Sequence, residues 1–111
     1  VREALAAANV PFRDEPDMVK AMSEADVVYQ TRIQKERFAT PDEYEAVRGI
    51  YVISPDSMAS MKRDAILLHP LPRVDEITAR VDADPRAAYF RQAQYGVYVR
   101  MALLAQVLGA A

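Results

Sequence analysis

An arginine-rich segment follows an apolar, β-branched stretch in the first third of the chain. The segment RIQKER, residues 32–37, comes directly after DVVYQT, residues 26–31. A guanidinium presents a planar fork of donors that matches a carboxylate, and Gln34 adds an amide two residues after Arg32. Such a segment could hold a small dicarboxylate or another anion. Composition alone favours the alternative of a solvated surface loop with internal ion pairs, because mixed-charge runs are common.

A second segment combines two prolines with charged residues, again directly after an apolar run. PLPRVDE, residues 70–76, follows AILLH, residues 65–69, and Leu71 lies between the two prolines. Because proline fixes φ and removes a backbone donor, this segment is stiff and its carbonyl groups are fixed in direction. Such carbonyls could accept hydrogen bonds from an amino or amide group of a ligand. A loop that simply leaves the sheet is an equally supported alternative.

His69 is the only histidine of the chain. Histidine often acts as an acid or base in enzymes. No nucleophile or orienting partner is evident near it in the sequence, so a structural role at a strand end is the better hypothesis. Several aromatic residues are predicted to pack rather than react, because they recur at helical spacing: Tyr44, Tyr89, Phe90, Tyr95 and Tyr98.

Segments of helix and strand character alternate along the chain and would position these two loops. Strands are predicted at residues 10–13, 26–31, 50–53 and 65–69, from their β-branched and apolar composition. Helices are predicted at residues 1–9, 16–25, 40–49, 54–62 and 84–109. The last helix carries an apolar stripe at three- and four-residue steps, formed by Phe90, Ala93, Val97, Met101, Leu104 and Leu108.

The most specific local signal is the start of the helix at residues 40–49. Thr40 and Glu43 form a capping-box pattern with Pro41 at the first helical position. The Thr40 side chain is expected to accept from the Glu43 amide, and the Glu43 carboxylate from the Thr40 amide. Gly49 is placed to end this helix.

Strands separated by helices predict an α/β fold with a parallel sheet and right-handed crossovers. We expect three layers, with the sheet flanked by helices, in an incomplete doubly wound domain over residues 1–111 that ends in a long helix. Because the chain opens on Val1 within helix-like sequence, we expect it to be cut from something longer, with a processed product as the alternative. Ligands of such sheets bind beyond the carboxyl ends of the strands, so both loops are expected to face one cleft if their two strands lie close in the sheet.

Composition excludes several classes of function. The net charge of −2 leaves no basic excess to neutralise the phosphates of a nucleic acid. No apolar run approaches the ~20 residues that a membrane span needs. The absence of cysteine excludes disulfides and thiolate metal sites, and a single histidine excludes a multi-histidine zinc site.

Three blocks of the sequence resemble signature blocks of the aspartate carbamoyltransferases. They are VVYQTRIQKERF, HPLPRVDEI and VD-x-DPRAAYFRQA-x-x-G. They occur in the order of that family and at about its spacing, and the match extends over residues 26–109. The resemblance implies the C-terminal, aspartate-binding domain of the catalytic chain.

That family condenses carbamoyl phosphate with L-aspartate to give N-carbamoyl-L-aspartate and phosphate in pyrimidine biosynthesis, without a metal or organic cofactor. The resemblance implies a homotrimer of two-domain chains in the cytoplasm, or in an organelle such as the plastid. The family's carbamoyl-phosphate domain carries a Ser-Thr-Arg-Thr phosphate loop and a catalytic histidine, and neither motif is in these residues. We therefore expect no catalytic residue in this chain, and an inactive fragment when it is alone.

The resemblance also implies roles for single residues in substrate binding. It puts Arg32 on a carboxylate of aspartate, with Gln34 orienting the same substrate. It puts the main-chain carbonyls of Leu71 and Pro72 toward the amino end of the carbamoyl group. Each implied role agrees with the chemistry of the loop that carries it.

Other positions match parts of the family that move or that set specificity. Glu36 and Arg37 match ion-pairing positions that stabilise the closed or interdomain arrangement, and residues 39–49 match a mobile loop and its helix. The related ornithine carbamoyltransferases carry a His-Cys-Leu-Pro motif where this chain has Pro70 in place of the cysteine. Aspartate is therefore the expected substrate. A non-catalytic amino-acid-binding, anion-binding or assembly module of the same fold is the alternative.

Overall fold

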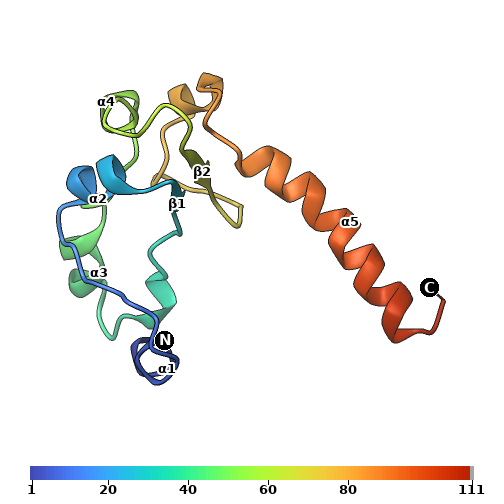
Figure 1. Ribbon diagram of the computed structural model, residues 1–111. Helices are drawn as coiled ribbons and strands as arrows, with labels where there is room; N and C mark the ends of the chain where they lie inside the picture. Colours follow the sequence, from blue (N-terminus) through green and yellow to red (C-terminus); the bar gives the residue numbers. More distant parts are fainter. Residues whose placement is uncertain (111) are drawn as a thin grey trace.

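The computed structural model describes residues 1–110, and its helices and strands alternate along the chain (Figure 1). The α-helices are α1 (Arg2–Ala7), α2 (Met18–Glu24), α3 (Pro41–Val47), α4 (Pro55–Met58) and α5 (Tyr89–Val107). The strands are β1 (Val27–Tyr29) and β2 (Ile66–Leu68), and short 3-10 helices are η1 (Lys35–Arg37) and η2 (Ala79–Ala83). The predicted α/β fold with a long C-terminal helix is confirmed.

Within residues 1–110 the sheet consists of β1 and β2, which lie parallel with Val28 opposite Leu67. Two isolated parallel bridges extend it, from Ile53 to Ile77 and from Leu67 to Ala87. The predicted strands at residues 26–31 and 65–69 are therefore confirmed in their central residues.

The other two predicted strands are wrong. Residues 10–13 form no strand, and residues 50–53 contribute only the bridge at Ile53. A strand persists only where a neighbour completes its hydrogen-bond ladder. Val10 and Phe12 are exposed and lack such a neighbour among the described residues, whereas Ile53 is fully buried and pairs.

The core lies on one face of β2 and is built from side chains of several elements. Leu67 is fully buried there, together with Met22 of α2, Met58 of α4 and Val81 of η2. Because successive side chains of a strand point to opposite faces, Ile66 and Leu68 face the other way. There they line a groove with the first half of α5.

The helix starts follow local capping chemistry, with differences in detail. The Thr40 hydroxyl accepts from the Glu43 amide at 3.4 Å, as expected. The Glu43 carboxylate accepts from the Ala39 amide at 3.1 Å, one residue earlier than predicted. Helix α2 begins after Asp17, whose carboxylate accepts from the Lys20 amide, rather than at the preceding proline. The helix predicted to reach residue 62 ends at residue 58.

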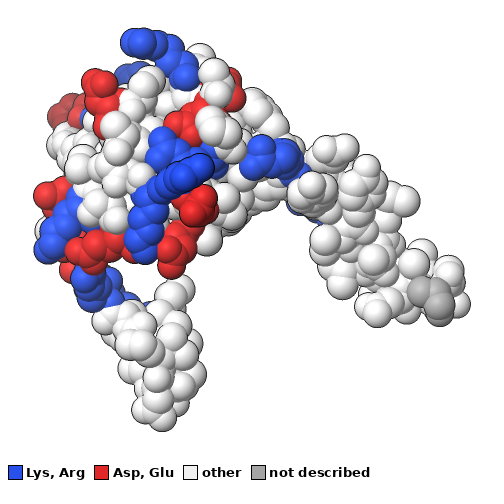
Figure 2. Space-filling view, turned by 45° about the horizontal axis from the view of Figure 1, so that its top comes forward, with Lys and Arg blue, Asp and Glu red and all other residues white. Residues whose placement is uncertain are grey.

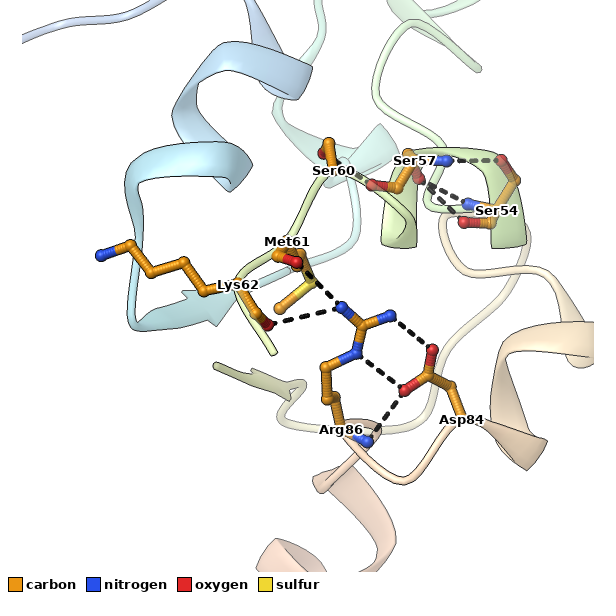
Figure 3. Close-up of polar contacts among 7 residues, drawn as sticks. All are labelled: Ser54, Ser57, Ser60, Met61, Lys62, Asp84 and Arg86. Atoms are coloured by element: carbon orange, nitrogen blue, oxygen red, sulfur yellow. Dashed lines mark hydrogen bonds and ion pairs between the residues drawn. The ribbon is translucent and has the colours of Figure 1, made fainter. Parts of the chain in front are cut away.

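Helix α5 begins at Tyr89, five residues after the predicted start at residue 84. Asp84 and Arg86 instead form a turn in front of the helix (Figure 3). The Arg86 guanidinium donates two hydrogen bonds to the Asp84 carboxylate, at 3.0 and 2.8 Å, and one to the Met61 carbonyl at 3.0 Å. This turn ties the start of α5 to the segment that precedes β2.

Beyond its first turns, α5 extends away from the rest of the molecule (Figure 1). The radius of gyration is 16.9 Å, against about 13 Å for a compact chain of this length. Tyr89 is the one buried residue of α5, and Val97, Met101 and Leu104 are more than half exposed. The last third of α5, after Arg100, carries no charged residue and lies in the arm at the right of Figure 2. A helix that is apolar around its whole circumference is typical of one that is buried.

None of the helices in residues 1–110 is both long enough and apolar enough to span a membrane.

Candidate functional site

The two loops singled out from the sequence line one pocket of about 450 Å³. Residues 31–34 and 37–38 form one side of it, and residues 69–72 form the other. Because β1 and β2 are parallel neighbours, their carboxyl ends lie at the same edge of the sheet. The Gln30 amide donates to the Leu68 carbonyl at 3.0 Å, so the ladder continues to where both loops begin. The predicted shared cleft is confirmed.

The structure brings together all four residues that the sequence analysis proposed for substrate binding. Arg32 and Gln34 line the pocket from the first loop, and Leu71 and Pro72 line it from the second. Arg37 lines it as well. Glu36 does not line the pocket, but its carboxylate contacts Arg32.

Arg32 and Glu36 form a two-point ion pair at the rim of the pocket. The two terminal nitrogens of Arg32 donate to the two carboxylate oxygens of Glu36, at 3.3 and 2.5 Å. The backbone amide of Glu36 and then the Arg32 guanidinium hold the pKa of the Glu36 carboxyl below its usual range. The internal ion pair expected of a plain surface loop is thus present, and it is part of the pocket's rim.

The pocket is suited to an anion. Among its described lining residues are two arginines, Arg32 and Arg37, and no carboxylate. Guanidinium groups bind planar carboxylates and phosphates in two-point geometry, and they stay charged at every physiological pH. The opposite wall includes the uncharged residues Leu71 and Pro72, so it faces the two arginines without adding a charge of its own.

The second loop has an unusual backbone at Leu71. Its φ is +51°, in the left-handed region that side chains other than glycine rarely adopt, and the Leu71–Pro72 peptide bond is cis. A leucine in this region costs about 1–2 kcal/mol relative to right-handed backbone. Such conformations persist where the surroundings hold them, and they concentrate at functional sites.

His69 holds this loop from beneath. The side chain is buried, and its Nδ1 accepts a hydrogen bond from the Leu71 amide at 2.8 Å. Its Nε2 lies 2.7 Å from Oε1 of Glu76, a residue that is itself buried. A structural position for His69 is confirmed, but the expectation that no orienting partner lies nearby is wrong. Six residues of loop lie between the two, and no sequence periodicity signals such a contact.

Glu76 organises the remainder of the loop. Its Oε2 accepts from the amides of Val74 and Asp75, at 3.1 and 3.2 Å. Burial alone would raise the pKa of the Glu76 carboxyl, but the amides of Glu76 and Val74 and the His69 ring hold it below its usual value. The carboxylate therefore stays ionised in the interior because its oxygens are supplied with donors.

Gln92 connects the start of α5 to both strand ends. Its side-chain oxygen accepts from the backbone amide of His69, and its side-chain nitrogen donates to the hydroxyl of Tyr29, each at 3.0 Å. The sequence assigned no role to Gln92. Only the folded arrangement places it opposite the ends of β1 and β2.

A polar cluster outside the pocket fixes the end of the second loop. The Arg73 guanidinium pairs with the Asp82 carboxylate, with 2.7 Å between Nη2 and Oδ2, and also contacts the Tyr89 hydroxyl. Burial and then the adjacent Asp82 carboxylate raise the pKa of the Tyr89 phenol to about 12. Only packing was predicted for Tyr89, and this cluster adds a polar contact.

A smaller cavity of about 210 Å³ lies behind Arg32, between the first loop, α3 and the second loop. The Arg48 guanidinium, at the end of α3, donates to the Asp75 carboxylate at 3.1 Å across this space. Residues 39–49, predicted to be a mobile loop and helix, are thus tied to the second loop by an exposed ion pair. Exposed pairs of this kind stabilise little and break readily.

Comparison with known proteins shows which family this chain is related to. Residues 2–107 match the family described as aspartate/ornithine carbamoyltransferase, Asp/Orn binding domain. An aspartate carbamoyltransferase 2, chloroplastic, of Pisum sativum is 53% identical over 109 residues, which is 97% of this chain and 28% of that protein. An aspartate carbamoyltransferase catalytic subunit of Clostridium botulinum is 45% identical over 108 residues, 97% of this chain and 35% of that protein. The chain thus spans about a third or less of these relatives.

Solved structures agree with the sequence relationship. The catalytic subunit of M. jannaschii aspartate transcarbamoylase has a TM-score of 0.83 and 44% identity, covering 98% of this chain and 36% of that one. The aspartate transcarbamoylase from Trypanosoma cruzi in complex with N-(phosphonacetyl)-L-aspartic acid has a TM-score of 0.78 and 42% identity, covering 93% and 33%. The chain therefore belongs to the aspartate/ornithine carbamoyltransferase family, of which it carries the Asp/Orn binding domain.

Proposed function

We propose that this chain is the aspartate-binding part of an aspartate carbamoyltransferase. The whole enzyme transfers the carbamoyl group of carbamoyl phosphate to L-aspartate, giving N-carbamoyl-L-aspartate and phosphate in de novo pyrimidine biosynthesis. The observation that carries this proposal is the single pocket with Arg32 and Gln34 on one side and Leu71 and Pro72 on the other.

Each wall of the pocket has its own task in this reaction. Arg32 binds a carboxylate of aspartate through its guanidinium fork, and Gln34 orients the same molecule. The carbonyls of Leu71 and Pro72 accept from the amino end of the carbamoyl group. The amine of aspartate forms a bond to the carbamoyl carbon, and the bond from that carbon to the phosphate oxygen breaks. The protein contributes mainly by positioning the two substrates and by electrostatics.

Aspartate fits the pocket better than ornithine does. The side chain of ornithine ends in a cation, which would meet the charges of Arg32 and Arg37. Aspartate offers a second carboxylate instead. The proline at position 70, where ornithine carbamoyltransferases carry cysteine, points the same way.

The rest of the active site belongs to a carbamoyl-phosphate domain of the same parent chain, in a homotrimer. The Ser-Thr-Arg-Thr phosphate loop expected there is not among residues 1–111, so this part is inactive alone. The uncharged last third of α5 is the surface that packs against that domain, because water-exposed apolar area on this scale favours burial. Glu36 and Arg37 support the closed arrangement, no cofactor takes part, and the enzyme acts in the cytoplasm or a plastid.

The test compares Arg32→Ala with Lys35→Ala in the full-length parent chain. Both changes remove one positive charge from the first loop, but Lys35 does not line the pocket. Loss of a charge-assisted contact should raise the KM for aspartate about tenfold to a hundredfold. The Lys35→Ala enzyme should remain close to the wild type, and the Kd for carbamoyl phosphate should change little in both.

Two results would contradict the proposal. An equal loss of affinity for both substrates in Arg32→Ala would contradict the assignment of Arg32 to the binding of aspartate. Aspartate binding by a full-length wild-type chain that never forms N-carbamoyl-L-aspartate would instead identify a non-catalytic binding module.

A further inference from the structure

We infer that His69 is a positioning residue whose imidazole, oriented by Glu76, fixes the backbone of Leu71 so that the second loop presents its carbonyls to the pocket. This inference rests on the proposed function for the identity of the ligand. The geometry that supports it does not, because it consists of contacts within the chain.

Leu71 offers one place at which the loop can be held. It lies between Pro70 and Pro72, and proline has no backbone N–H. The Leu71 amide is therefore the only main-chain donor in residues 70–72, which line this side of the pocket together with His69. That donor is bound to Nδ1 of His69 at 2.8 Å.

The contact requires one form of the imidazole ring. An ionised carboxylate only accepts hydrogen bonds, so Nε2 of His69 must carry the proton that faces Oε1 of Glu76 at 2.7 Å. The Leu71 amide donates to Nδ1, so Nδ1 carries no proton in this contact and acts as the acceptor. Glu76 selects this tautomer, and its other oxygen is already occupied by the amides of Val74 and Asp75.

The ring is held in place as well as in the correct tautomer. His69 and Glu76 are 2% and 5% exposed. The backbone amide of His69 donates to the side chain of Gln92 at 3.0 Å, so the residue is anchored from α5. Burial and anchoring leave the imidazole little freedom to move with the loop.

The backbone of Leu71 needs such a support. Its φ of +51° is unfavourable for a leucine, and without the Nδ1 contact the residue would relax toward negative φ. That relaxation turns the peptide groups on both sides of Leu71, and with them the carbonyl directions in the pocket. His69 thus acts on the ligand through Leu71 and does not need to touch it.

Two substitutions separate the two halves of the imidazole in the full-length enzyme. In His69→Asn the amide oxygen takes the place of Nδ1 and can still accept from Leu71, but the contact to Glu76 is lost. In His69→Gln the longer amide reaches Glu76 in the place of Nε2 and leaves the Leu71 amide without its acceptor. Both variants remove the ring, so general effects of its loss are shared.

The expected result is a difference between the two variants in carbamoyl phosphate binding. The Kd of carbamoyl phosphate should be about tenfold higher in His69→Gln than in His69→Asn, the equivalent of one lost hydrogen bond. The KM for aspartate, governed by Arg32, should differ by less than this ratio. Equal Kd values in the two variants, at any level, would overturn the inference, because a merely structural histidine predicts no such difference.

A second measurement does not depend on catalysis. The ¹⁵N chemical shifts of the His69 ring, assigned by their disappearance in His69→Asn, should show a protonated Nε2 and an unprotonated Nδ1. A protonated Nδ1 would overturn the inference even in an active enzyme. Absence of carbamoyltransferase activity in the wild type, with the expected tautomer present, would instead overturn the proposed function and leave the support of Leu71 in place.

Discussion

The Arg32 guanidinium donates two hydrogen bonds to the carboxylate of Glu36, four residues further along the chain. Glu36 is the middle residue of the 3-10 helix η1, and Arg32 lies three residues before that helix begins. Arginine has five N–H donors, so three remain for a ligand once Glu36 has taken two. The ion pair sets the plane of the guanidinium in this structure, and the remaining donors lie in the same plane.

The fork geometry of Arg32 gives a first prediction. Arg32→Lys keeps the positive charge but replaces the planar fork with a single ammonium group, which binds a carboxylate at one point. We expect the KM for aspartate to rise about tenfold in the full-length enzyme. Steady-state kinetics with saturating carbamoyl phosphate measures this. Arg63→Lys, the same change at an exposed position away from the pocket, is the control. An unaltered KM in Arg32→Lys would mean that charge alone suffices.

The Tyr89 phenol predicts a loss of stability in alkali. Its pKa is raised to about 12 from an ordinary value of 10.0. Because the pKa is raised in the folded state, the protonated phenol contributes to the free energy of unfolding. That contribution is complete below about pH 10 and is lost as the pH rises toward 12. The loss amounts to roughly 2–3 kcal/mol of unfolding free energy. Urea unfolding across this range measures it.

The control for this alkaline prediction is another tyrosine. Tyr89→Phe should remove the Tyr89 share of the pH dependence, and Tyr98→Phe, at a residue 57% exposed, should keep it. If the two variants lose stability in parallel between pH 10 and pH 12, Tyr89 is not its source.

The turn at Asp84 predicts an opposite effect in acid. Hydrogen bonds from the Arg86 side chain, opposed by burial and aided by the Arg86 amide, hold the pKa of the Asp84 carboxyl below its ordinary value of 3.8. A lowered pKa in the folded state gives stability that is present above the unfolded pKa and lost as the pH falls through the folded one. The free energy of unfolding of Asp84→Asn should therefore be about 1–2 kcal/mol lower at neutral pH. The variant should also lack the loss of stability in acid that protonation of Asp84 causes.

The matched control for Asp84→Asn is Asp64→Asn, at an exposed position two residues before β2. This change should leave the unfolding free energy nearly the same at neutral pH. Thermal and urea unfolding of the parent chain at neutral and acid pH make the comparison. A loss of equal size in both variants would show that the turn in front of α5 is not specially stabilised by its ion pair.

The exposed face of α5 predicts self-association of residues 1–111 when they are prepared without the remainder of the parent. Met101, Leu104 and Val107 are each more than 60% exposed, in the last third of α5, which carries no charged residue. Exposed apolar patches of this kind associate. Sedimentation equilibrium should show oligomers or aggregates, and Leu104→Glu with Val107→Glu should shift the population toward monomer. A monodisperse monomer at high concentration would contradict this.

The pocket could be predicted from the sequence because each strand and the loop after it can be recognised from their own residues. Residues 26–31 and 65–69 are β-branched and apolar enough to form parallel strands, and the carboxyl ends of parallel strands share an edge of the sheet. Once the strands are assigned, the loops that leave them must meet. The residue types at Arg32 and Leu71 then predict the chemistry of the two walls.

Features that depend on distant partners were not predictable in this way. Residues 10–13 have the composition of a strand, but Val10 and Phe12 meet no neighbouring strand among residues 1–110. Helix α5 begins later than predicted because the Arg86 side chain turns back to bind Asp84 and the carbonyl of Met61, which lies 25 residues away in the sequence. The partnership of His69 with Glu76 depends on the shape of the loop between them, which tertiary contacts decide.

The parallel pairing of Val28 with Leu67 has a consequence for how the site comes into existence. These two residues are about 40 positions apart in the sequence. The two walls of the pocket therefore come together only when a loop of about that length closes. Closing so large a loop costs entropy before any strand contact compensates for it, and non-local pairings of this kind slow folding. The pocket is therefore expected to assemble late, so that a nascent chain has no complete pocket until residue 72 has emerged and β2 has paired with β1.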